Sequence, residues 1–271
     1  KLVLENLIRW GYKGRILGVN PRSDDKEVNG IRMYKTISDL PITPDLVFAL
    51  VPSKLIPDLV DECGHKGTRW MAIPSGGFNE LSQEGQNLAD LLMEKARKHG
   101  IRFVGPNGLT VANTANGLCL PFIPSFPPPK GGLSIIAQSG GVGIMLWNFM
   151  TDENFGMAKF ASIGNKLDLD EVDFLEYFGR DPETKIIAMY LESIPRGKEL
   201  LAAAEKINKP IMILKSNTTT AGRRAAMSHT AALSNDDEII DAAFERAGII
   251  RISNFYEFIS VAKAFDLPPI R

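Results

Sequence analysis

The stretch Leu133-Ser134-Ile135-Ile136-Ala137-Gln138-Ser139-Gly140-Gly141-Val142-Gly143-Ile144-Met145-Leu146-Trp147 decides the fold of this chain. Its first five residues form an apolar, β-branched run that predicts a buried strand, and residues 144–149 predict a helix. The glycines between them would let backbone N–H groups at the head of the helix face an anion such as phosphate. A tight strand-to-helix turn that needs glycine only for its geometry explains the same residues. The segment matches neither a Walker A loop nor a G-x-G-x-x-G fingerprint, so a dedicated NTP or nicotinamide site in this half is not supported.

Short apolar runs and helical patterns alternate on both sides of this unit. Strands are expected at residues 15–19, 46–51, 70–73, 102–104, 133–137, 158–162, 186–191, 211–214 and 249–252. Helices are expected at residues 53–60, 82–99, 144–149 and 236–247. Apolar runs of this length, separated by helices, are typical of parallel sheets, so we predict an α/β protein. The second half resembles the flavodoxin-like arrangement.

A proline-rich segment, Pro121-Phe122-Ile123-Pro124-Ser125-Phe126-Pro127-Pro128-Pro129-Lys130, divides the chain. Proline at this density cannot continue a helix or a central strand, so the segment predicts an exposed linker. We therefore expect a first domain over residues 1–120, a linker over residues 121–131 and an independently packed second domain over residues 132–271.

Composition narrows the class of protein. The chain has 271 residues and is 44% hydrophobic, enough for a sizeable core. Its 31 basic and 32 acidic residues give a net charge of -1, which provides no broad positive field for nucleic acid or an anionic membrane. Cys63 and Cys119 lie in separate segments, as in a reducing compartment, and no apolar run reaches the length of a membrane span. We expect a cytoplasmic protein that binds neither nucleic acid nor membrane.

One of the three histidines, His229, lies among small residues at 225–233, in the loop after the strand expected at 211–214. Open α/β folds bind their ligands at that edge of the sheet, which favours a reactive histidine. A hydrogen-bonded surface histidine explains the same pattern, so this segment does not decide alone. His65 and His99 follow the ends of helical patterns, where a cationic ring complements the helix dipole and a structural role is expected.

Ordered blocks along the chain carry a family resemblance. In the second half they are Ala137-Gln138-Ser139-Gly140-Gly141, Ile163-Gly164-Asn165-Lys166-Leu167-Asp168-Leu169-Asp170, Tyr190-Leu191-Glu192-Ser193-Ile194, Leu214-Lys215-Ser216 and Ser228-His229-Thr230. In the first half they are Val19-Asn20-Pro21, Val51-Pro52, Ile73-Pro74-Ser75-Gly76-Gly77-Phe78 and Gly105-Pro106-Asn107. In this order the blocks resemble the NDP-forming acyl-CoA synthetases of the succinyl-CoA synthetase superfamily, including the ADP-forming acetyl-CoA synthetases. The resemblance implies an α-subunit-type chain, with a Rossmann-like CoA-binding domain followed by a flavodoxin-like ligase domain.

The activity that the resemblance implies is a phosphoryl relay by an acid–thiol ligase. Phosphate attacks an acyl-CoA to give acyl phosphate and CoA, His229 takes the phosphoryl group and releases the acid, and the phosphohistidine then charges ADP or GDP. A neutral imidazole is a good nucleophile, and a carboxylate can fix its tautomer and stabilise the product. Glu192 matches the family's histidine-orienting glutamate, although a solvated acidic residue at a strand end explains it too. The phosphoryl group would lie against Ser139, Gly140 and Gly141.

The resemblance also implies where coenzyme A binds. Eight residues that follow predicted strands are expected to line one carboxyl edge, with Arg22 on a phosphate: Asn20, Pro21, Arg22, Pro52, Ser53, Ser75, Gly76 and Asn107. Asn165 and Lys166 are expected to contact substrate, and no metal ligand is expected in this chain.

The chain departs from the family pattern in three respects. It begins within the helix that should follow a first strand and glycine turn, and it stops before any ATP-grasp segment, so we expect a fragment or one subunit of an oligomer. ADP or GDP, with Mg, would then bind a partner ATP-grasp domain or subunit. Position 108 is glycine, where the family often has cysteine. The residues do not determine the acyl group or the choice of nucleotide.

Two other classes remain open. A non-catalytic module that senses CoA or acyl-CoA would share the fold, although such modules often replace the histidine. A nicotinamide-dependent Rossmann enzyme would share the first domain, with Asp24 or Asp25 on the ribose.

Overall fold

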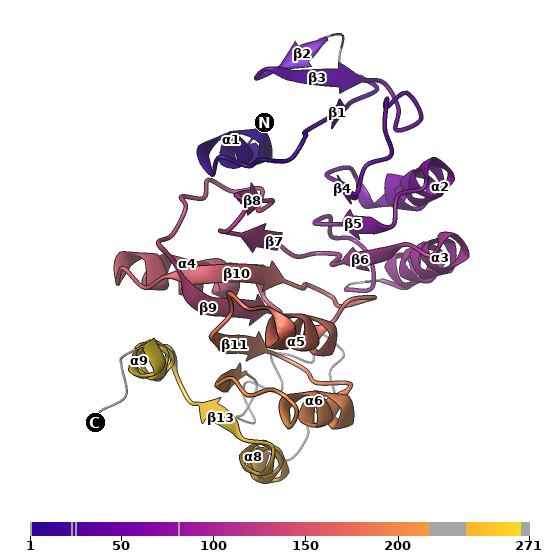
Figure 1. Cartoon of the computed structure of the whole chain (residues 1–271). Helices are drawn as coiled ribbons and strands as arrows, with labels where there is room; N and C mark the ends of the chain where they lie inside the picture. Colours follow the sequence, from indigo (N-terminus) through magenta and orange to yellow (C-terminus); the bar gives the residue numbers. More distant parts are fainter. Residues whose placement is uncertain (1, 23, 25, 81, 217–236, 267–271) are drawn as a thin grey trace.

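The computed structural model describes residues 2–22, 24, 26–80, 82–216 and 237–266 (Figure 1). Helices in these ranges are α1 (Leu2–Arg9), α2 (Ile56–Lys66), α3 (Gln83–His99), α4 (Gly140–Asp152), α5 (Glu171–Arg180), α6 (Gly197–Ala204), α8 (Asp237–Arg246) and α9 (Phe255–Asp266), with a 3-10 turn, η1 (Ser53–Leu55). Strands are β1 (Gly18–Val19), β2 (Glu27–Val28), β3 (Ile31–Tyr34), β4 (Leu46–Phe48), β5 (Trp70–Ala72), β6 (Arg102–Val104), β7 (Thr110–Asn113), β8 (Leu118–Cys119), β9 (Lys130–Ala137), β10 (Met157–Ser162), β11 (Ile186–Leu191), β12 (Ile211–Lys215) and β13 (Ile249–Ile252). No helix in these ranges has both the length and the apolar character that crossing a bilayer requires.

The first unit is built on a parallel sheet of order β4-β5-β6. Helices α2 and α3 pack side by side next to it, and their buried faces contribute to its core (Figure 1). Helix α3 begins after Ser82, whose hydroxyl caps the first turn, and ends at Gly100, whose φ of 62° is left-handed. The sequence predicted both of these ends. The helix expected at residues 53–60 continues as α2 to Lys66 and ends at Gly67.

The strand expected at residues 15–19 is reduced to β1, which pairs in parallel with β3 and not with β4. A separate sheet of order β1-β3-β2 results. Leu17 and Val19 still pack against the core cluster that contains Val47 and Met71, so β1 remains next to the first sheet (Figure 1).

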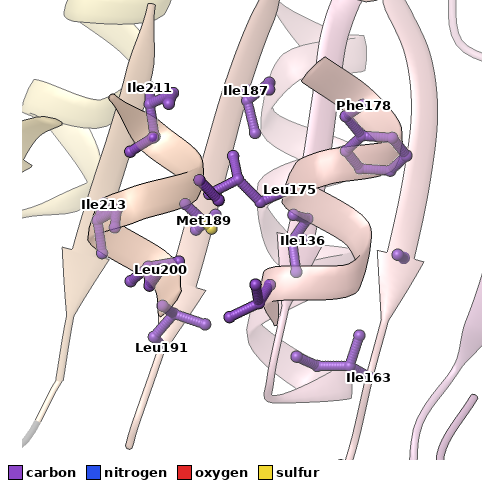
Figure 2. Packing of buried hydrophobic residues seen from close by; sticks show 14 of the residues in the cluster. Ile136, Ile163, Leu175, Phe178, Ile187, Met189, Leu191, Leu200, Ile211 and Ile213 are labelled. Atoms are coloured by element: carbon purple, nitrogen blue, oxygen red, sulfur yellow. The ribbon is translucent and has the colours of Figure 1, made fainter. Parts of the chain in front are cut away.

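The second unit is a seven-stranded sheet of order β13-β12-β11-β9-β10-β7-β8, in which the strands from β13 to β10 are parallel. Successive residues of β9 face opposite sides. Ile135 belongs to the core beneath α4 and α9, and Ile136 to the core beneath α5, α6 and α8. Figure 2 shows Leu175 and Phe178 of α5 close to Ile136 and Ile187. A parallel sheet with helices on both faces is the flavodoxin-like arrangement that the sequence predicted.

Strands β7 and β8 extend this second sheet across the boundary expected at residue 120. Strand β7 is antiparallel to β10, with Thr110 opposite Ser162 and Asn113 opposite Lys159, and β8 pairs with β7. The sequence assigned residues 110–119 to the first domain, because strands of four and two residues carry too little pattern to reveal their partners.

The proline-rich segment is packed against α1. Asn6 is 1% exposed, and its amide nitrogen donates to Pro121 O at 2.8 Å and to Ile123 O at 2.7 Å. The Asn6 side-chain oxygen accepts from Ser125 N at 3.2 Å, and Trp10 Nε1 donates to Ser125 O at 3.1 Å. The prediction of an exposed linker is therefore wrong at the buried residues Pro121, Ser125 and Pro128, whereas Pro124, Phe126, Pro127 and Lys130 are exposed. The side chains of Asn6 in α1 and of Trp10 just after it, both remote in sequence, supply the hydrogen bonds that hold this segment.

The segment that follows β10 joins the two units. Leu169 forms a bridge with Val104 of β6, and Asn165 N donates to Pro106 O at 2.9 Å. Val104 and Ile163 belong to one buried cluster. The expectation of two independently packed domains is therefore wrong, because this cluster crosses between them. The carboxyl ends of β6 and β10 lie next to each other.

Both cysteines are fully buried. Burial raises the pKa of the Cys63 thiol, and likewise that of Cys119, to about 12. Since the thiolate is the reactive form, neither residue offers a nucleophile near neutral pH.

Candidate active site

The glycine turn after β9 forms an open helix N-terminus. Ser139 caps α4, with its hydroxyl accepting from Val142 N at 3.4 Å. A Cβ built at Gly140 would lie 3.2 Å from Leu109 Cγ, whereas one built at Gly141 would meet only Ser139 Oγ, at 4.0 Å. A side chain at position 140 would therefore press on Leu109, whereas Gly141 leaves the approach open. The first N–H groups of an α-helix lack partners within the helix, so this end can receive an anion.

Glu192 lies beside this turn because β9 and β11 are neighbours. Ala137 is paired with Tyr190, so Ser139 and Glu192 each lie two residues further along adjacent strands. The Gln138 side-chain oxygen accepts from Glu192 N at 2.9 Å and from Ser193 N at 3.1 Å. The amide nitrogen of Gln138 donates to Ser193 Oγ at 3.2 Å. The predicted phosphate turn and the predicted orienting glutamate are thus held together through Gln138.

Two lysines hold the same turn from other strands. Lys215, at the end of β12, donates to Glu192 O at 3.0 Å and to Ser216 O at 2.7 Å. Lys166, in the segment after β10, donates to Ser193 O at 2.8 Å. Gln138 and Lys215 lie within the family blocks, but no role was predicted for either residue. A polar residue at or just past a strand end was the available signal.

Lys166 points into the protein, where its side chain is 5% exposed. Its ammonium lies 2.8 Å from Glu171 Oε2, and the Glu171 carboxylate is completely buried, with neither oxygen in hydrogen-bond geometry. Burial raises the pKa of the Glu171 carboxyl, and the Lys166 charge opposes that rise without cancelling it. The ammonium expected to meet substrate is therefore engaged by Glu171 and Ser193.

His229 lies outside the described residues, within 217–236. Ser216 is the last described residue before that segment, and its N–H donates to Leu191 O at 3.0 Å. The chain therefore enters the histidine segment beside Glu192.

The first unit brings several predicted CoA residues to one edge. Asn107 N donates to Ser75 O at 3.1 Å, and a Cβ built at Gly76 would lie 3.1 Å from Asn107 Oδ1. A Cβ built at Gly77 would lie 3.0 Å from Ser53 Oγ. Pro52 precedes η1 at the same strand ends. Gly76 and Asn107 are exposed there, which leaves a ligand room to approach.

Asn20, Pro21 and Arg22 follow β1 and are exposed. The Asn20 side chain accepts from Arg22 N at 3.0 Å, which closes a small turn. Because β1 pairs with β3, sheet pairing does not bring these residues to the edge that holds Ser53 and Asn107.

Asn165 connects the two edges. Its amide nitrogen donates to Asn79 Oδ1 and to Glu80 Oε1, each at 2.7 Å, and its side-chain oxygen accepts from Asn107 Nδ2 at 3.2 Å. A Cβ built at Gly108 would lie 2.6 Å from Ser162 O, so this arrangement has no room for a cysteine at position 108.

Two features lie apart from this site. A hollow of about 340 Å³ at the C-terminal end of α3 includes Arg97, Gly100 and Arg102 in its lining, at the opposite end of β6 from Asn107. Asp24, on which the nicotinamide alternative depended, forms a surface ion pair with Lys35 at 3.3 Å, and Asp25 lies outside the described residues.

A parallel sheet with helices on both faces, and with an open helix N-terminus at its carboxyl edge, defines a doubly wound α/β protein. Residues 1–114 match the model of the CoA binding domain, and residues 130–265 match that of the succinyl-CoA ligase like flavodoxin domain. The chain therefore belongs to the succinyl-CoA ligase like family, with the flavodoxin domain of that family joined here to a CoA binding domain.

Several proteins named as acetate–CoA ligases or acetyl-coenzyme A synthetases are similar to this chain. The chain is 36% identical, over 98% of its length, to the alpha subunit of ADP-forming acetate–CoA ligase I of Pyrococcus furiosus, of which it covers 58%. It is 40% identical, over 95% of its length, to the ADP-forming acetate–CoA ligase of Methanocaldococcus jannaschii, of which it covers 36%. The solved structure of acetyl-coenzyme A synthetase 1 of Ca. Korarchaeum cryptofilum, in complex with phosphate and ADP, matches 99% of this chain with a TM-score of 0.92 and 32% identity, and the chain covers 58% of it. The chain thus spans little more than half, or less, of these relatives.

Proposed function

We propose that this chain supplies the CoA-binding and phosphohistidine parts of an NDP-forming acyl-CoA synthetase, an acid–thiol ligase. The enzyme interconverts acyl-CoA, phosphate and NDP with acid, CoA and NTP. One observation carries the proposal: the open N-terminus of α4 is tied through Gln138 to Glu192, at the point where the chain enters the His229 segment.

Each residue at this edge has a defined task in the relay. Ser139, Gly140 and Gly141 offer N–H groups and the positive end of the α4 dipole to the phosphoryl oxygens. His229 attacks the acyl phosphate and carries the phosphoryl group. The Glu192 carboxylate orients the imidazole and stabilises the cation that forms as phosphorus is attacked.

Coenzyme A is assigned to the edge formed by the ends of β4, β5 and β6. The residues there suit it: Gly76 has no side chain to block a phosphate, and Ser53 and Asn107 provide polar groups beside it. Sheet pairing does not bring Arg22 to this edge. We propose that Arg22 contacts a phosphate of CoA when CoA is bound there. Asn165, which contacts both units, would then lie between CoA and the reacting acyl group.

The nucleotide step is assigned to a partner. ADP or GDP, with Mg, would bind an ATP-grasp domain or subunit, as in an oligomer of α-type chains with their partners. Relatives named as alpha subunits support this, and their names make acetate and ADP the first substrates to test. A cytoplasmic location agrees with two buried free thiols.

The half-reaction of this chain alone tests the proposal. Incubation with acetyl phosphate should yield a phosphoprotein that is labile in acid and stable in base, and His229→Ala should abolish it. An acid-stable adduct, or labelling that survives His229→Ala, would contradict the proposal. Stabilisation by CoA without any adduct would favour the CoA-sensing alternative.

A further inference from the structure

We propose that Gln138 and Lys166 are positioning residues, which hold the Glu192–Ser193 turn in the one arrangement that presents the Glu192 carboxylate to the phosphoryl acceptor. This inference rests on the proposed function. Lys166, held by Glu171, then positions the turn and does not contact substrate directly.

The turn is held at every backbone polar atom of its two residues. Gln138 accepts from the N–H of Glu192 and from that of Ser193. Lys215 donates to the carbonyl of Glu192, and Lys166 to the carbonyl of Ser193. Gln138 directly follows β9, Lys215 is the last residue of β12, and Lys166 lies in the segment after β10. A turn just beyond a strand end has lost its ladder of hydrogen bonds, so side chains here decide where its carboxylate lies.

A glutamine is chemically suited to position 138. Its carboxamide accepts from two N–H groups with the oxygen and donates to Ser193 Oγ with the nitrogen. Glutamate would keep the acceptor, lose the donor and add a second negative charge near Glu192. Alanine would leave both N–H groups without this partner.

A buried ion pair such as Lys166–Glu171 contributes little net stability to a protein. The two side chains are 5% and 0% exposed, and removing such charges from water offsets most of their attraction. Two apolar side chains of similar volume would stabilise the fold as well. What apolar side chains could not supply is the hydrogen bond from the ammonium to Ser193 O. The backbone of Lys166, with φ of 53°, directs the side chain from a left-handed position.

A pair of variants separates this task from stability. Lys166→Met leaves Glu171 buried without its cation, and should lower both the melting temperature and the rate of phosphoryl transfer from acetyl phosphate. The double variant Lys166→Met/Glu171→Met removes both charges, and should regain most of the melting temperature while transfer stays about tenfold or more below wild type. The KM for acetyl phosphate should change little, because the clamp acts on Glu192 and not on the bound anion. A double variant with wild-type transfer would overturn the proposal.

Gln138 variants test the other half of the clamp. Gln138→Ala should slow transfer about tenfold, and Gln138→Asn should not rescue it, because the shorter side chain cannot reach both N–H groups. Lys209→Met is the matched control. Lys209 also donates to two carbonyls, those of Phe178 and Asp181, at the amino edge of the sheet. Its loss should leave transfer unchanged.

Amide hydrogen exchange tests the hold on the Glu192–Ser193 turn without any need for phosphoryl transfer. The N–H groups of Glu192 and Ser193 should exchange faster in Gln138→Ala than in wild type, while the core of β11 stays protected. If wild type takes up no phosphoryl group, the proposed function fails and exchange alone decides. Unchanged exchange at both amides would remove Gln138 from the clamp.

Discussion

Two lysines with equally buried side chains, Lys159 and Lys166, lie near opposite edges of the seven-stranded sheet. Each side chain is 5% exposed. At the amino edge, Lys159 contacts two carboxylates, Asp181 at 2.7 Å and Glu183 at 2.8 Å. At the carboxyl edge, Lys166 has one carboxylate, that of Glu171, and donates a hydrogen bond to a backbone carbonyl. Within the described residues, the contacts of the Lys159 ammonium are with carboxylates only. Lys166 also holds a backbone carbonyl of the turn beside the candidate site.

The pKa values of the Asp181 and Glu171 carboxyl groups differ in the same way. Burial pushes the pKa of Asp181 upward, but hydrogen bonds from Lys159 and Thr184 outweigh it, so the pKa lies below its ordinary value. Burial raises the pKa of Glu171, and Lys166 does not reverse the rise. The charged form is thus favoured at the amino edge and disfavoured at the carboxyl edge. The lowered pKa of Asp181 agrees with a stabilising role for its pair with Lys159, and the raised pKa of Glu171 agrees with the positioning role proposed for Lys166.

The largest expected effect is a difference in phosphoryl transfer between a variant at the carboxyl edge and a variant at the amino edge. Glu192→Gln should slow phosphoryl transfer about a thousandfold, since the amide keeps the shape but loses the charge that stabilises the imidazolium. Asp181→Asn should change transfer less than about twofold. Quench-flow measurement with labelled acetyl phosphate compares them. Equal losses in the two variants would break the comparison.

A smaller effect concerns stability. Lys159→Met leaves Asp181 and Glu183 without their shared cation, and should lower the free energy of unfolding by about 3 kcal/mol. Phosphoryl transfer by the folded fraction should remain at the wild-type rate. Urea denaturation with a parallel transfer assay checks both statements. A loss of transfer without a loss of stability would show that the amino edge also serves the site.

The smallest expected effect is that Asp181 and Glu171 change the free energy of unfolding in opposite directions as the pH rises. Asp181 has a lowered folded pKa, so its contribution is present above the unfolded value of about 3.9 and is lost as the pH falls through the folded value. Glu171 has a raised folded pKa, so stability declines as the pH rises from the unfolded value of about 4.3 toward the folded one. Asp181→Asn should therefore be less stable than wild type above about pH 4. As the pH rises from about 4.3 toward the folded pKa of Glu171, the Glu171→Gln variant should lose less free energy of unfolding than wild type does. Urea denaturation from acid to neutral pH measures both differences, and slopes of equal sign would refute the contrast.

Local patterns predicted most of the fold. The run at 133–137 became the carboxyl end of β9, and Ser139 caps the helix that follows it, because apolar periodicity and glycine placement act over a few residues. The pairing of β7 with β10 was missed. A four-residue strand such as β7 does not reveal its partner, and the same holds for β1 and β3.

The site was predicted in part. The strand pattern put Glu192 and Ser139 at strand ends, and the sheet order made those ends neighbours. Lys166 was expected to face substrate, yet its ammonium lies in a buried ion pair, because Glu171 from the first turn of α5 provides a partner. The role of His229 stays a prediction, since it lies outside the described residues.

The sequence by itself determined the alternating elements, the glycine turn and the family, because each depends on residues close together in the chain or on ordered blocks of them. Only the tertiary structure decided that Asn6 holds the proline-rich segment, that residues 110–119 join the second sheet, and that Gln138, Lys166 and Lys215 converge on one turn. Each of these depends on pairing between groups far apart in the chain. A hydrogen bond at 2.8 Å is set by the folded positions of both partners, which no local pattern of apolar residues encodes.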